Sequence, residues 1–272
     1  MIRPRPYVAV PLALPVLLAA FLLAGCSGGG TSHGADPAQV DSTEVPSVGT
    51  CRNLTRADVA RPTNASPLVA CDDPHNAETY AAGRLPKRFA DVKPDDDALS
   101  DWVYDRCTVL LEKHLGADQS LLMRSMLSWV WFGPSDRAWE KGARWFRCDL
   151  VGGGESGAPY VDLPTNTTNM LRGKNIDDRW MVCARGASVN STKVPCSEKH
   201  AWRAVTTIKL GEPKDSYPGD DTVKTKTRSY CADSVKAWLG YPESYDYGYT
   251  WFGEDEWDAG NRRSVCWAKT DK

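Results

Sequence analysis

Residues 139–148 read WEKGARWFRC, and residues 257–266 read WDAGNRRSVC. Both stretches have the pattern Trp-x2-Gly-x-Arg-x3-Cys, and each follows a Trp-Phe-Gly triplet, at 131–133 and at 251–253. Such ordered self-similarity is the mark of a duplicated structural unit. The sequence therefore predicts two copies of one fold.

Matches upstream of these stretches appear in the same order in both halves. The first half has Cys71-x3-His75 with Leu85, then Pro94-x-Asp96-Asp97, Cys107 and Leu115-Gly116; the second has Cys196-x3-His200 with Leu210, then Pro218-x-Asp220-Asp221, Cys231 and Leu239-Gly240. We expect repeat one at 48–152, a linker at 153–176 and repeat two at 177–272. Each repeat, at about 100 residues, has an ordinary domain size.

Each repeat combines strand and helix patterns. Residues 76–85 and 201–210 read as strands, and Val205 to Ile208 carry the β-branched residues typical of one. After Pro94, apolar residues recur at helical spacing up to Leu115, and Gly116 marks the helix end. The acids at 95–97 and 220–221 suit helix starts. We expect an α+β fold, with one main helix on a small antiparallel sheet per copy.

The N-terminus has the features of an export signal. Arg3 and Arg5 precede an apolar run from Val8 to Leu23, which is shorter than the roughly 20 residues of a spanning helix and contains two prolines. The run ends in Leu23-Ala24-Gly25-Cys26, which looks like the lipobox of bacterial lipoproteins. That resemblance implies a signal peptide at 1–25 and acyl chains such as palmitate on Cys26; an ordinary secretory signal with an incidental Cys is the alternative.

Residues 26–47 are rich in Gly, Ser, Thr, Asp and Pro and predict a flexible tether. With the anchor on Cys26, we expect the folded part at the outer face of the cytoplasmic membrane. The chain has 33 basic and 35 acidic residues, a net charge of −2. This balance excludes an electrostatic nucleic-acid binder, which needs a basic surplus.

Apart from Cys26, the cysteines divide evenly between the copies. They are Cys51, Cys71, Cys107 and Cys148 in the first copy and Cys183, Cys196, Cys231 and Cys266 in the second. An exported chain with an even set favours disulfides over zinc, because Cys-x2-Cys pairs are missing. Three pairings per copy are open. Pairing of neighbours follows if the helix Cys packs on the closing strand.

The chain resembles the septum-formation domain family of actinobacterial envelope proteins. The resemblance rests on Cys71-Asp-Asp-Pro-His75-x2-Glu78, the helix Cys107 and Trp139-x2-Gly142-x-Arg144-x3-Cys148. Copy two departs from it, with Lys199 for the Pro and Arg203 for the Glu. The family name implies a link to division septa, and it implies no particular activity.

Residues able to carry catalysis or bind metal are few. His75 and His200 each follow a Cys, and we expect each to form a hydrogen bond with a nearby backbone group. The alternative role for these histidines is metal binding or acid–base catalysis. Strand alternation places His75 and Glu78 on opposite faces. We identify no catalytic residue, metal ligand or cofactor site. Trp139 and Trp257 are retained as motif residues.

Aromatic residues are the remaining signal. Tyr245, Tyr247, Tyr249 and Trp251 alternate and share one strand face. The face is either core or a stacking platform for glycan or peptide. Trp251 recurs as Trp131 and is expected in the core. Tyr245 and Tyr247 lack aromatic counterparts in copy one and are expected to be more exposed.

These observations favour a lipid-anchored envelope protein that acts by binding peptidoglycan or an envelope protein. The alternative from another class is an envelope hydrolase or transferase that uses acidic residues or His75. A sensor that binds another membrane protein is a third hypothesis. An enzyme should show a cluster of titratable groups in a pocket of one copy. Glu78 against Arg203 is the one such divergence in the sequence.

Overall fold

The structure, a computed structural model, describes residues 37–153 and 158–270. The first half holds α1 (Pro37–Val40), β1 (Cys51–Arg52), α2 (Arg56–Val59), β2 (Leu68–Val69), β3 (Ala77–Arg84), η1 (Lys87–Phe89), α3 (Asp97–Leu115), α4 (Gln119–Leu122), β4 (Leu127–Phe132), α5 (Asp136–Glu140) and β5 (Trp145–Gly152). The second half holds η2 (Asp178–Trp180), β6 (Val182–Ala184), β7 (Lys193–Pro195), β8 (Trp202–Lys209), α6 (Asp220–Trp238), β9 (Tyr247–Thr250), α7 (Glu254–Asp258) and β10 (Arg263–Lys269).

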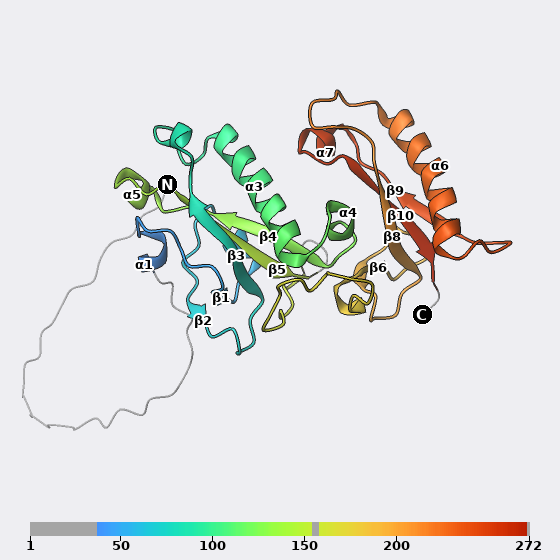
Figure 1. The fold of residues 1–272 in the computed structure, drawn as a ribbon, viewed down its shortest axis with the longest axis horizontal. Helices are drawn as coiled ribbons and strands as arrows, with labels where there is room; N and C mark the ends of the chain where they lie inside the picture. Colours follow the sequence, from blue (N-terminus) through green and yellow to red (C-terminus); the bar gives the residue numbers. More distant parts are fainter. Residues whose placement is uncertain (1–36, 154–157, 271–272) are drawn as a thin grey trace, which may run out of the picture. The chain divides into compact units, whose positions relative to one another are not determined.

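The two halves have the same topology (Figure 1). Each forms a five-stranded sheet, in the orders β2-β1-β3-β5-β4 and β7-β6-β8-β10-β9, and its strand pairs are antiparallel. Position by position, α3 corresponds to α6 and α5 to α7. The predicted duplication and the α+β fold class are both confirmed.

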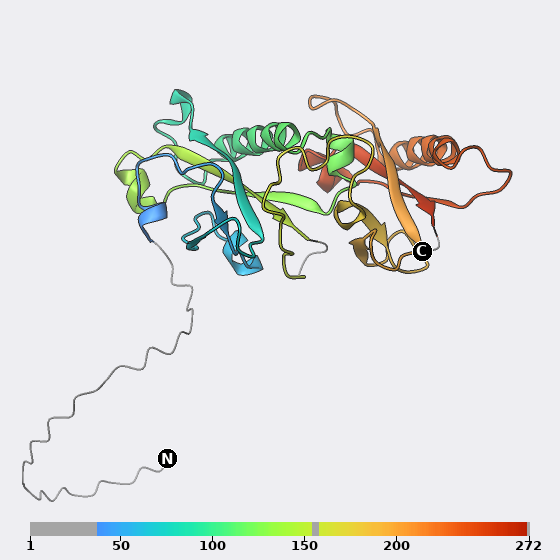
Figure 2. The same cartoon turned by 60° about the horizontal axis from the view of Figure 1, so that its bottom comes forward.

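The long helix of copy one begins and ends where its sequence requires. Asp96 is the N-cap and accepts a bond from the amide of Leu99 at 2.9 Å. Gly116 follows the last turn with φ 67°, a left-handed conformation that glycine tolerates. In α6 the cap is Gly219, without a side-chain bond, and Asp220 and Asp221 lie in the first turn. Figure 2 shows α3 on one face of its sheet and residues 37–70 toward the other.

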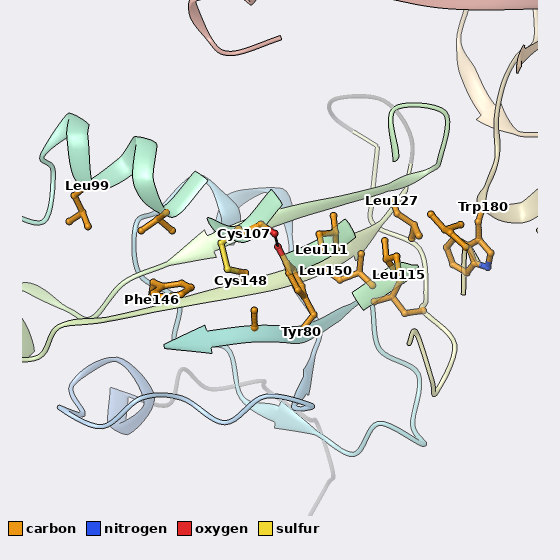
Figure 3. Close-up of a cluster of buried hydrophobic side chains, with 14 of the residues drawn as sticks. Tyr80, Leu99, Cys107, Leu111, Leu115, Leu127, Phe146, Cys148, Leu150 and Trp180 are labelled. Atoms are coloured by element: carbon orange, nitrogen blue, oxygen red, sulfur yellow. Dashed lines mark hydrogen bonds between the residues drawn. A yellow bond between two sulfur atoms is a disulfide. The ribbon is translucent and has the colours of Figure 1, made fainter. Parts of the chain in front are cut away.

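The main core of copy one lies between α3 and the sheet (Figure 3). Leu99, Leu111 and Leu115 form the buried stripe of the helix, and Leu150 faces them from β5. The hydroxyl of Tyr80 donates to the carbonyl of Cys107 at 2.9 Å, so this buried phenol has a partner. The apolar spacing seen in the sequence is therefore the helix face that the sheet covers.

Disulfides join neighbouring cysteines in both copies. The pairs are Cys51–Cys71, Cys107–Cys148, Cys183–Cys196 and Cys231–Cys266. Each copy thus has one bridge within the small strands and one that ties the long helix to the closing strand. Of the three pairings that the sequence leaves open, the pairing of neighbours is the one formed.

The segment expected to be a linker is part of copy one. Leu163 and Leu171 are buried in its main core, at 6% and 0% exposed. Their amides donate to the carbonyls of His75 and Leu115 at 2.8 and 3.0 Å. A composition rich in Gly, Pro, Thr and Asn suggested a free loop, but two leucines in it supply enough apolar surface to dock it.

The second half of the expected tether also packs on copy one. The hydroxyl of Ser135 donates to Asp41 at 2.6 Å, and the indole of Trp145 donates to the carbonyl of Ser42 at 2.9 Å. Val45 packs against the buried Trp145. The folded part therefore begins about ten residues before the expected boundary at 48, because these contacts satisfy groups that a solvated tether would leave to water.

The two copies contact each other within the described residues. Trp180 joins the core of copy one, and its carbonyl accepts from the amide of Met126 at 2.8 Å. The hydroxyl of Thr207 donates to Ser120 on α4 at 2.8 Å. Within the described part of the chain, no helix has the length and apolarity of a membrane span.

Candidate functional site

The repeated Trp-x2-Gly-x-Arg-x3-Cys motif builds a corner of the fold. The guanidinium of Arg144 lies 4.0 Å from the ring centroid of Trp139, and that of Arg262 lies 3.7 Å from the ring of Trp257. Arg144 also donates to the carbonyls of Trp139 and Ala90, at 2.8 and 2.9 Å. Each arginine thus uses its planar fork to join the turn of its own motif to a segment ahead of the long helix, a structural role.

His75 and His200 occupy equivalent, buried positions. Nδ1 of His75 lies 2.8 Å from the carbonyl of Asp73, and Nδ1 of His200 lies 2.7 Å from that of Glu198. The two rings are 1% and 4% exposed. The expected backbone bond is therefore present in both copies. At 1% exposed, the His75 side chain is closed to a substrate in this structure.

Glu78 has a different partner from any the sequence suggested. The hydroxyl of Thr167 donates to Glu78 Oε2 at 2.5 Å, and His114 Nε2 lies 2.7 Å from that hydroxyl. His114 and Glu78 are 3.9 Å apart. In copy two, Arg203 and Trp238 replace Glu78 and His114, and Arg203 pairs with Asp178 at 2.7 Å.

The cluster of Glu78, Thr167 and His114 holds a segment of the protein's own chain rather than a ligand. Thr167 is fully buried and belongs to the segment that docks on copy one. Burial lowers the pKa of His114, and the nearby charge of Glu78 partly offsets the effect. The cavities described below are lined by residues other than Glu78, His114 and Thr167. Its geometry indicates a polar anchor for residues 163–171.

Other candidate sites for chemistry are equally poor. Among the described residues, no group of three or more His, Cys, Asp or Glu could hold a metal ion. Asp96 caps its helix, while Asp95 and Asp97 are exposed beside it. Cys26, the expected lipidation site, lies outside the described residues.

The tyrosines of the second copy form a ladder at the edge of their sheet. Ring centroids are 5.9 Å apart for Tyr245 and Tyr247, 6.4 Å for Tyr247 and Tyr249, and 5.6 Å for Tyr249 and Trp251. The three tyrosines are half-buried and pack against the core under α6. The hydroxyl of Tyr245 donates to the carbonyl of Ala232 in that helix at 2.9 Å.

The expected exposure along this ladder is reversed. Trp251 is 42% exposed, and the Lys224 ammonium lies 5.2 Å from its ring. Tyr245 and Tyr247, expected to be the exposed pair, lie under the helix. The recurring buried residue of the Trp-Phe-Gly triplet is its phenylalanine, with Phe132 at 0% and Phe252 at 1% exposed. Recurrence in both copies thus identified the triplet as a repeated feature, but the prediction that its Trp is the core residue is wrong for Trp251.

Copy one carries a second aromatic surface, which we name the β4 groove. It is an open groove of about 590 Å³ along the free edge of β4, lined by Val59, Arg61, Pro62, Tyr104, Trp129 and Trp131. The rings of Tyr104 and Trp129 are 5.0 Å apart, and Tyr104 is 50% exposed. Tyr104 was not among the predicted surface residues. Its position off the buried stripe of the predicted helix would have indicated that its ring is exposed.

A polar cavity adjoins the β4 groove at Arg61, which lines both. It has a volume of about 420 Å³. Its wall includes the amides and hydroxyls of Asn53, Thr55, Thr63, Asn64, Ser66 and Asn76. Apolar rings next to amide and hydroxyl groups are suited to a ligand that has both apolar faces and many hydrogen-bonding groups.

The family described as "Septum formation" matches the chain twice, at residues 22–133 and 123–266. The chain belongs to the septum-formation family. The two matches correspond to the two copies of the fold. Membership of this family links the protein to septum formation or cell division. No curated protein and no solved structure matches the chain.

Proposed function

We propose that this septum-formation protein is held at the outer face of the cytoplasmic membrane by a lipid on Cys26 and binds peptidoglycan glycan through the β4 groove. The observation that carries the proposal is the exposed ring of Tyr104 against the half-buried ring of Trp129, beside a cavity whose wall includes amides and hydroxyls. Sugar rings present apolar C–H faces that stack on aromatic rings, and their hydroxyls and acetamido groups bond to amides.

Copy two contributes through Trp251. Its ring is the exposed end of the ladder, whereas the tyrosines are held under α6. The ladder lies at the same sheet edge as the β4 groove in copy one, since β4 and β9 are equivalent edge strands. The two copies therefore present related but unequal aromatic surfaces, which suits two contacts along one polymer.

Co-sedimentation with purified cell wall tests the proposal. Tyr104→Ala and Trp251→Ala should each weaken retention by about tenfold, the usual effect of removing an aromatic anchor from an interface. Trp238→Ala is the matched control, because Trp238 is 49% exposed but lines neither aromatic surface. Retention that stays at the wild-type level in both variants would contradict the proposal.

Tyr245→Ala separates binding from stability. This ring packs in the core and its hydroxyl has a helix partner, so the change should lower the melting temperature, as large-to-small core substitutions do. Retention by the folded fraction should be unaffected. If Tyr245→Ala instead abolished retention without loss of stability, the ladder tyrosines rather than Trp251 would form the contact.

A further inference from the structure

Four polar side chains of copy one lie together on the sheet face opposite α3. Arg52 comes from β1, Thr79 from β3, and Arg147 and Asp149 from β5; all four are at most 3% exposed. Arg52 donates to the Thr79 hydroxyl at 2.7 Å, and that hydroxyl donates to Asp149 at 2.7 Å. Arg147 forms an ion pair with Asp149 at 2.9 Å. This buried cluster uses one carboxylate for two guanidinium groups.

The cluster therefore carries an excess positive charge inside the protein. Burial lowers the pKa of Arg52 to about 10, and repulsion from Arg147 adds to the effect while Asp149 opposes it. Arg52 still carries its charge at neutral pH. An uncompensated buried charge is unfavourable unless a counter-charge is supplied.

Copy two shows that the fold does not need this cluster. The equivalent residues there are Ala184, Ala204, Val265 and Trp267, which belong to an apolar cluster. The strand registers agree, because Thr79 pairs with Asp149 and Ala204 pairs with Trp267. Apolar replacement of buried ion pairs is often neutral or stabilising, so a purely structural role gives no reason to keep two arginines.

A cavity of about 220 Å³ opens onto the cluster. Its wall includes Arg52, Arg147, Gln39 and the hydroxyl residues Ser42 and Thr50. Arg147 Nε is buried and has no hydrogen-bond partner among the described residues. Glu44 also lines the cavity but is exposed, so water screens its charge.

We propose that this cavity binds a small oxyanion, a carboxylate or phosphate group, through Arg147 and Arg52. The planar guanidinium fork matches two oxygens of such a group, and the anion supplies the missing counter-charge. At about 220 Å³ the cavity is smaller than the β4 groove, which points to an end group or a free anion rather than a polymer. This site is separate from the β4 groove and does not depend on the function proposed for it.

Titration calorimetry on the full-length protein tests the site. Inorganic phosphate and acetate are the two probes, with chloride at equal ionic strength as the reference. Saturable binding of phosphate would identify a phosphate-bearing source, and saturable binding of acetate a carboxylate such as a peptide terminus. If neither probe binds beyond the chloride reference at millimolar concentrations, the proposal is overturned.

Two variants locate the binding. Arg147→Lys keeps the charge but loses the fork, and it should weaken binding by about tenfold. The fourfold exchange Arg52→Ala, Thr79→Ala, Arg147→Val and Asp149→Trp installs the residues of copy two and should abolish binding. Arg185→Ala, an exposed arginine of copy two, is the control and should bind as the wild type does. Unchanged affinity in Arg147→Lys overturns the assignment even if the fourfold variant does not fold.

Discussion

Arg144 and Arg262 show how a strong sequence motif can be explained by the fold alone. Each guanidinium stacks on its motif Trp and donates to backbone carbonyls near the start of the long helix. The motif Gly has a positive φ in both copies, 90° at Gly142 and 94° at Gly260, which a residue with a side chain adopts only with strain. Every member of the motif thus has a structural reason to be there.

His114 should make the stability of the protein depend on pH. Burial holds its pKa below the ordinary value of 6.5. As the pH falls through that value, the unfolded chain binds a proton more readily than the folded one, so the free energy of unfolding decreases. The contribution is fully present above pH 6.5 and is lost on acidification. The slope from this one group is at most about 1.4 kcal/mol per pH unit.

Urea unfolding of the wild type and His114→Gln across the acidic range measures this dependence. Gln can still donate to Thr167, so the segment that docks there should stay in place. The difference between the two stability curves isolates His114 from His75 and His200. Parallel curves would show that His114 titrates alike in both states, contrary to the expectation.

Among the secondary-structure elements, the long helices are each tied to their sheets by a disulfide in the core. Cys107–Cys148 joins α3 to β5, and Cys231–Cys266 joins α6 to β10. All four of these cysteines are fully buried. The bridge crosses the layer between helix and sheet, so it restrains the two elements that form the core.

The two bridges with the most different loop lengths should differ in their effect on stability. Cys107 and Cys148 are 41 residues apart, and Cys183 and Cys196 are 13 apart. In the chain-entropy account, removing the first bridge by double Cys→Ala substitution costs about 4 kcal/mol and removing the second about 3 kcal/mol. Loss of buried sulfur in the main core adds to the first effect. Urea midpoints of the two double variants provide the comparison, and an equal or larger loss for Cys183–Cys196 would be contrary to it.

Edge strands give the two copies their different surfaces. β4 and β9 end equivalent sheets, and each presents aromatic rings on the side of its long helix. In copy one, α3 supplies Tyr104 beside Trp129, whereas Arg228 stands at that helix position in copy two. The residue at this helix position, Tyr104 or Arg228, thus determines whether an exposed aromatic ring lies beside the edge strand.

In the whole molecule, copy one is incomplete without the segment that follows its last strand and the first residues of copy two. Leu163, Leu171 and Trp180 follow its last strand yet are buried in its main core. We therefore expect a fragment of residues 37–152 to be largely unfolded, while a fragment of residues 37–181 should fold. Circular dichroism and the cooperativity of thermal unfolding distinguish the two. Equal stability of the fragments would show that these three side chains are dispensable.

Membrane attachment is the other prediction for the whole molecule. The wild type should be found in the membrane fraction, with a mass that includes a diacylglycerol on an N-terminal Cys26, because two or more acyl chains give stable attachment. Cys26→Ala should be released to the soluble fraction. Tight retention of Cys26→Ala in membranes would refute lipid anchoring at this residue.

Local patterns in the sequence were sufficient to predict the duplication, the α+β class and the long helices. These features depend on local spacing, such as the cap at Asp96, the stripe to Leu115 and the strand pattern of Val205 to Ile208. Neighbour order among the cysteines was enough to propose the disulfides once the helix was assumed to pack on the closing strand. Each of these inferences uses residues close in the chain, where periodicity and turn chemistry act directly.

Which side chains contact each other, and which are exposed, could be seen only in the folded structure. Glu78 contacts Thr167, 89 residues away, and Arg52 and Arg147 share Asp149 from strands far apart in the chain. Tyr104 is exposed because it lies off the buried stripe, and Trp251 is exposed although Lys224 of α6 lies near its ring. Burial and partner choice depend on contacts between distant segments, which composition and spacing do not encode. The exposed aromatic surfaces of this protein are therefore products of its packing.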